Sequence, residues 1–158
     1  MKKRFLLIFL IPLISFQGFS QIEKNTMLLG GNASMIASTS GNSFFNFNPG
    51  AAFFINNHLC IGASASLMFF NEEFYWGAAP FTRYYFSPKK TQSVFASGSL
   101  GISNLNSTSL NFSTGVGHVW FINKNVGFET ELIGSTNFED FTVGMYLGFQ
   151  VYFKESSK

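Results

Sequence analysis

The sequence predicts an all-β fold, an eight-stranded antiparallel up-and-down transmembrane β-barrel, on three observations. Charged residues make up 11% of the chain, against about 25% in soluble domains. Aromatic residues make up 18%, and apolar residues alternate with small ones along most of the chain after residue 20. No apolar run of about 18 residues follows that point, so no membrane-spanning helix is available. Because a backbone in hydrocarbon must satisfy its own hydrogen bonds, a closed barrel is the remaining way to span a bilayer.

Residues 1–20 have the organisation of a cleaved secretory signal peptide. Three basic residues at positions 2–4 precede a short apolar run, and Gly18 and Ser20 place small residues before a cut near Ser20/Gln21. The run is too short for the alternative, a membrane-anchor helix. We expect residues 21–158 to form a single barrel domain. Removing the leader leaves 7 basic against 8 acidic residues, which does not favour a nucleic-acid partner.

Eight strands are expected, each near the length that crosses a bilayer at a tilt. Turn-forming residues separate the segments, and no segment has a helical period. The expected ranges are 26–38, 44–55, 59–70, 78–86, 93–103, 109–122, 126–135 and 141–153.

The alternation predicts which face of each strand meets lipid. In the last strand one face carries large apolar residues from Phe141 to Phe153, and the other carries Gly, Thr, Gln and Tyr. A soluble β-barrel or sandwich is the main structural alternative. It would need charged residues on its outer face, and the less apolar face of these strands offers almost none.

The few loop charges separate by side if both termini face the periplasm. All charged residues in the expected outer connections are acidic, and all charged residues in the expected periplasmic turns are lysines. The acidic residues are Glu72, Glu73, Glu139 and Asp140, and the lysines are Lys89, Lys90 and Lys124.

Three segments resemble the outer-membrane β-barrel domain family of small porin-like proteins, of the OmpA/OmpX type. They are FNPGAAFFINNHLCIGASASL (Phe47 to Leu67), APFTRYYF (Ala79 to Phe86) and the terminal GFQVYF (Gly148 to Phe153). The resemblance covers residues 27–153. It implies residence in the outer membrane of a Gram-negative cell envelope and does not imply a defined substrate.

Three charged residues lie inside expected strands. They are Arg83 in the fourth strand and Glu129 and Glu131 in the seventh. A charge facing lipid near mid-bilayer costs several kcal/mol, so we expect all three to point into the lumen. Both segments approach the periplasmic end, and the sequence therefore predicts an ion pair between Arg83 and one or both glutamates. A stabilising plug is the preferred role, and an ion-selectivity filter is the alternative.

Aromatic residues near the strand ends suit the two membrane interfaces. We expect girdles made of Tyr75, Trp76, Tyr84, Phe86 and Trp120. The last strand ends in alternating apolar residues that resemble the signal read by barrel-insertion machinery, namely Phe149, Val151 and Phe153.

The sequence offers no recognisable catalytic set, so we expect a protein that is not an enzyme and that uses no cofactor or metal. His58 and His118 are the only histidines, and Cys60 is the only cysteine, too few for a zinc site. The expected function is a structural or interaction role in the envelope. Its alternative is porin-like passage of small solutes, and a lipid-modifying enzyme is the third possibility. Expected partners are outer-membrane lipids and, during insertion, the barrel-assembly machinery.

Overall fold

The structure is a computed structural model of the 158-residue chain. It describes residues 22–37, 43–70, 73–88, 91–104, 109–137 and 141–154, with side chains left out at 34–37, 43 and 44. The expected signal peptide lies outside these residues. So do Glu72, Lys89, Lys90, Glu139 and Asp140. The described residues include no helix long and apolar enough to cross a membrane.

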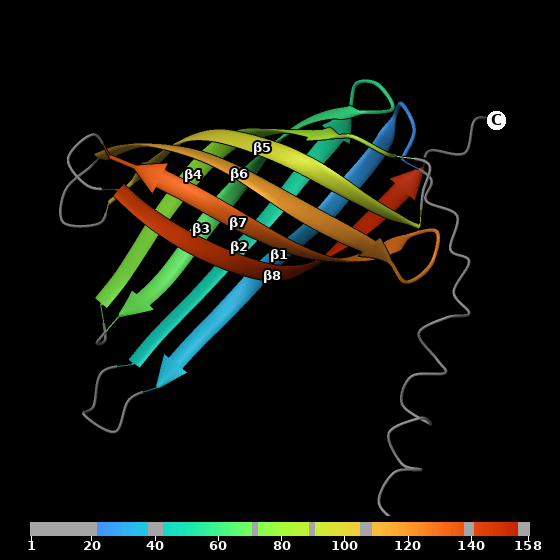
Figure 1. Cartoon of the computed structure of the whole chain (residues 1–158). Coiled ribbons are helices and arrows are strands. Elements are labelled where there is room, and N and C mark those ends of the chain that lie inside the picture. The colour runs from blue at the N-terminus through green and yellow to red at the C-terminus, as the bar shows by residue number, and fades with distance from the viewer. Residues whose placement is uncertain are drawn as a thin grey trace, which may run out of the picture.

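Eight antiparallel strands form one closed barrel in sequence order, so the expected fold class is confirmed (Figure 1). The last strand returns to the first and pairs with it from Thr26↔Lys154 to Asn32↔Gly148. This pairing leaves the sheet without an open edge. The strands are β1 (Thr26–Ala37), β2 (Ser43–Phe54), β3 (Leu59–Phe70), β4 (Glu73–Tyr85), β5 (Gln92–Ser103), β6 (Ser109–Phe121), β7 (Val126–Thr136) and β8 (Phe141–Lys154).

The barrel has two different ends. The end that carries both ends of the described chain and the tight connections at 55–58 and 122–125, on the right of Figure 1, is the turn end. The opposite end, where β1, β3, β5 and β7 finish, is the loop end. Lys124 lies at the turn end and Glu73 at the loop end, so these two charges lie at opposite ends of the barrel.

Two hairpins at the turn end close by the same side-chain chemistry. Asn56 Oδ1 accepts hydrogen bonds from the backbone N–H groups of His58 at 2.8 Å and Leu59 at 2.9 Å. Asn123 Oδ1 accepts from Asn125 at 2.8 Å and Val126 at 2.9 Å. An asparagine that bonds the backbone two residues ahead favours a tight turn, which explains why both connections are short.

The fourth strand begins earlier than expected, at Glu73 rather than residue 78. The segment NEEFYWG looks like a loop because of its acidic residues and glycine. However, Phe74 and Trp76 point outward while Tyr75 and Gly77 do not, and Phe74 pairs with Phe69 on β3. The two-residue period therefore continues through the segment, and cross-strand aromatic pairing extends the ladder.

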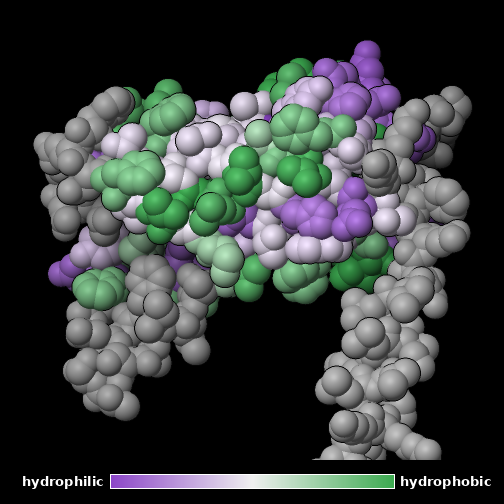
Figure 2. Space-filling view, viewed as in Figure 1, coloured by the Kyte–Doolittle hydropathy of each residue, from purple (hydrophilic) through white to green (hydrophobic). Residues whose placement is uncertain are grey.

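Alternation along the strands sorts the side chains between the outer face and the lumen. On β8, Phe141 is 71% exposed and Met145 is 70% exposed, whereas Gln150 is 4% exposed. The outer face is rich in Phe, Leu, Val and Ile over all eight strands. Figure 2 shows this apolar surface on the side of the barrel, with hydrophilic residues gathered mainly toward the turn end.

Candidate functional site: charged cluster and polar cavity in the lumen

The lumen at the turn end is filled by an apolar and aromatic plug. Its ring centroids lie 5.4 Å apart for Phe54 and Tyr85, 5.3 Å for Tyr85 and Phe95, and 5.1 Å for Phe121 and Tyr152. All five rings are buried. Five further residues complete the plug and are also buried, namely Ile22, Leu28, Ala52, Cys60 and Val119.

A glycine on β6 makes room for the plug. A Cβ at Gly117 would overlap the ring of Phe95, which lies on the neighbouring strand β5. The ring therefore lies against bare backbone instead of a side chain. In a narrow lumen, such small residues allow large ones to fit opposite them.

A charged cluster lies next to the plug, on the side of the plug that faces the loop end. Arg83 on β4 donates hydrogen bonds from Nη1 to both carboxylate oxygens of Glu129, at 3.1 and 3.0 Å, and from Nη2 to Glu131 at 3.1 Å. The structure thus brings together the three charged residues that the sequence places in the lumen. Their side chains are 12% exposed for the arginine and 6% for each glutamate.

Neutral groups complete the cluster. Gln150 Nε2 donates to Glu129 at 2.6 Å, and the Ser97 hydroxyl donates to Glu131. The guanidinium carbon of Arg83 also lies 4.8 Å from the centre of the Phe95 ring and 5.4 Å from that of Phe81, a cation–π geometry. Each carboxylate oxygen of both glutamates therefore accepts at least one hydrogen bond. This saturation is what a buried ionic group requires.

The position of Gln150 depends on a glycine on β1. A Cβ at Gly30 would overlap the side-chain amide of Gln150, which lies across the β1–β8 seam. Sequence reasoning missed Gln150 and Ser97 as members of the cluster. The signal was present, because Gln150 shares the lumen face of β8 and is its only amide side chain.

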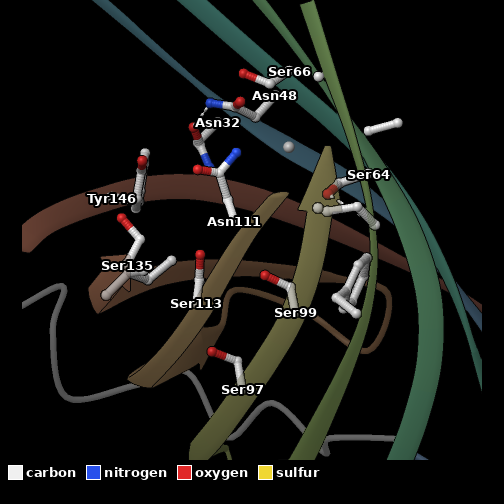
Figure 3. Close-up of a pocket in the computed structure, with 18 of the residues that line it drawn as sticks. Asn32, Asn48, Ser64, Ser66, Ser97, Ser99, Asn111, Ser113, Ser135 and Tyr146 are labelled. Carbon is white, nitrogen blue, oxygen red and sulfur yellow. Dashed lines mark hydrogen bonds between the residues drawn. The ribbon is translucent and has the colours of Figure 1, made fainter. Parts of the chain in front are cut away.

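Above the cluster, the loop half of the lumen holds a cavity of about 380 Å³. Arg83, Glu131 and Gln150 form its floor, and its walls are mostly Ser, Asn, Gly and a few apolar residues. Figure 3 shows the polar side chains pointing from several strands into one space. They include Asn32, Asn48, Ser99, Asn111, Ser113 and Ser135.

Four of the five rings expected in the aromatic girdles point outward, and one does not. Trp76, Tyr84, Phe86 and Trp120 point outward and are between 42% and 57% exposed. Tyr75 does not belong with them, because it alternates with Trp76 and therefore lies on the lumen face, where it pairs with Met68 and donates a hydrogen bond to Glu73. The reason is that the early start of β4 makes Tyr75 a strand residue whose face is fixed by the period of two.

The end of β8 faces outward as its alternation predicts. Phe149 and Phe153 are 58% and 47% exposed, and Val151 between them on the same face is half-buried. Phe153 pairs with Met27 and Val151 with Leu29 across the seam. These three residues are therefore part of the strand that closes the barrel.

The two histidines and the cysteine each make contacts that belong to the fold. His58 Nδ1 lies 2.8 Å from the carbonyl oxygen of Tyr85, and because a carbonyl only accepts, Nδ1 is the donor. His118 faces outward, with its ring 4.0 Å from that of Trp120. Cys60 is buried in the plug. Within the described ranges, no group of three or more potential metal ligands occurs.

Comparisons with known proteins concern the fold. No family model matches the chain, and no curated protein matches its sequence. The Yersinia pestis outer membrane protein Ail, solved in a phospholipid bilayer nanodisc, superposes with a TM-score of 0.55 at 13% identity, over 83% of this chain and 100% of that one. A de novo designed transmembrane β-barrel superposes with a TM-score of 0.51 at 10% identity, over 83% and 98%. The chain is thus a closed eight-stranded β-barrel with the fold of small outer-membrane barrel proteins.

Proposed function

We propose that the barrel resides in the outer membrane, has a structural or interaction role in the envelope, and does not conduct solutes. The aromatic plug carries this proposal. A solute that crossed the lumen would have to pass the buried rings of Phe54, Tyr85 and Phe95 and the ion pairs above them. Eight strands leave an interior that side chains fill, and here they fill its turn half.

Membrane residence is supported by the outer face. Large apolar side chains cover the strands, and a soluble protein rarely exposes such a continuous apolar surface. Trp76 lies near the loop end and Trp120 near the turn end, and amphipathic rings at the two ends of a barrel suit the headgroup level. Lipids of the outer membrane are the proposed permanent partners. The barrel-assembly machinery, reading Phe149, Val151 and Phe153, is the proposed transient one.

The test is flux through the reconstituted full chain. Liposome swelling and planar-bilayer recording are expected to show no solute passage and no single-channel steps. The double variant Phe54→Ala/Tyr85→Ala, if it migrates as a folded barrel on an unboiled gel, is expected to leak. The matched control Phe53→Ala changes an outward residue and is expected to remain sealed. Steady conductance by the unmodified protein would instead support the porin-like alternative.

A further inference from the structure

We propose that the lumenal cavity of the loop half binds a neutral polyhydroxylated molecule about the size of one sugar ring. Its volume of about 380 Å³ lies in the range of small-molecule sites. It ends blindly on the charged cluster and the plug, so a molecule that enters it is held rather than passed on.

The charges at the floor favour a neutral ligand. The Arg83 guanidinium binds both glutamates, and Ser97 and Gln150 satisfy their remaining contacts. No further charged side chain lines the cavity among the described residues. An ionic ligand would have to break this cluster or leave its own charge without a partner, and either outcome is costly.

The free hydrogen-bonding capacity is instead in neutral groups. Among the described residues, the hydroxyls of Ser99, Ser113 and Ser135 have no hydrogen-bond partner in the protein, and they point into the same space (Figure 3). Each hydroxyl offers one donor and two acceptor sites. Converging groups of this kind match a ligand that carries several hydroxyls of its own.

The asparagines add fixed donors and acceptors. Asn48 Nδ2 donates to Asn32 Oδ1 at 2.9 Å, which leaves the amide hydrogens of Asn32 and the carbonyl of Asn48 unused by this contact. Asn111 Nδ2 donates to Ser103 at 2.8 Å, which leaves its carbonyl. These contacts hold the amides in place, so a ligand meets an arrangement that is already organised.

The walls are not uniformly polar, and this narrows the ligand class. Phe81, Ile133 and the ring of Tyr146 also line the cavity. A sugar ring presents hydroxyls at its edge and C–H groups on its faces, so it complements a wall of this mixed kind. Ligand sites commonly combine apolar surface with a few placed polar groups.

The test is binding by the full barrel in nanodiscs, followed by amide chemical-shift mapping. The probes are glucose and N-acetylglucosamine, with glucosamine and glucuronate as charged analogues and glycerol at equal concentration as a solvent control. We expect saturable shifts at Ser99, Ser113 and Ser135 with the neutral sugars and weaker ones with the charged pair. The cavity-filling variant Ser113→Leu is expected to weaken binding by about tenfold or more. The control Thr114→Leu, on the outward face of the same strand, is expected to bind within about twofold of the parent.

A second variant keeps the test informative if Ser113→Leu does not fold. A Cβ at Gly50 would make only ordinary contacts, 3.5 Å to Ser64 and 3.6 Å to Phe81, so Gly50→Ala narrows the cavity without strain. Shifts that do not saturate, that match glycerol, or that persist unchanged in both variants would mean a cavity filled by water only and would overturn the proposal. Binding without liposome swelling leaves the non-conducting role intact, whereas swelling by the bound sugar would refute that role separately.

Discussion

The two halves of the lumen are built on the same eight strands but differ in which side chains fill them. In the turn half, inward positions hold Phe, Tyr, Leu and Val, and their side chains are almost completely buried. In the loop half, inward positions on the same strands hold Ser, Asn and Gly around a cavity. Along β5, for example, the inward face runs from Phe95 through Ser97 and Ser99 to Ser103. One barrel lumen can therefore contain a packed core in its turn half and an open cavity, here called the cup, in its loop half. The charged cluster lies at the boundary between them.

The largest expected effect is at that boundary. Arg83→Ala leaves two buried carboxylates without their cation, which typically costs about 3–5 kcal/mol. We expect a clearly lower urea midpoint for unfolding from lipid vesicles, read by tryptophan fluorescence. Ser99→Ala is the control, because its hydroxyl has no protein partner among the described residues.

A double-mutant cycle sharpens this result. Arg83→Ala combined with Glu129→Gln should destabilise less than the two single changes added together, because the contacting side chains lose one shared interaction. Additive effects would mean that water screens the cluster, and the boundary between the two halves would then have to lie nearer the turn end.

The plug should respond to truncation as a protein core does. Phe95→Ala removes a ring that is 0% exposed and contacts Tyr85 and Arg83, so we expect a loss of about 3 kcal/mol in the free energy of unfolding. Ile133→Ala in the loop half should cost about 1 kcal/mol, since the deleted atoms border an existing cavity and create no new one. Equal losses at the two positions would contradict the division of the lumen.

Gln150 tests whether the cluster needs its neutral members. Gln150→Leu keeps most of the side-chain volume but removes the 2.6 Å donor to Glu129. A hydrogen bond to a charged group is worth about 1.5–3 kcal/mol, so we expect a loss of about 2 kcal/mol in the same unfolding assay. Tyr146→Phe serves as the control. Tyr146 lines the cavity two inward positions from Gln150 along β8, and its substitution should change the free energy of unfolding little.

The sequence predicts most of the fold and only part of the site. Alternation with a period of two assigns the outward and inward faces of β3, β5 and β8, and the cost of charge in lipid places Arg83, Glu129 and Glu131 in the lumen. It does not determine which inward residues meet across the barrel, because that depends on how each strand is staggered against its neighbour. Gln150 is identifiable as the only amide on the lumen face of β8, but its contact with Glu129 and the packing of the plug could be found only once the register was known. Tyr75 is expected in a girdle at the end of the strand because the acidic residues of NEEFYWG are typical of a loop, whereas β4 already begins at Glu73 and its alternation places Tyr75 on the lumen face.

The smallest expected effect on stability is for a residue that lines the cup, and it bears most directly on the comparison of the two halves of the lumen. Ser113→Ala removes a hydroxyl that lines the cavity and has no hydrogen-bond partner among the described residues. In a packed core, such a deletion would disturb its neighbours, but here water or a ligand replaces the lost contact. We therefore expect a change within about 0.5 kcal/mol in stability, alongside weaker binding of the neutral sugars. A loss above about 1.5 kcal/mol would place Ser113 in a network of buried hydrogen bonds, and the loop half would then be a second core rather than a cup.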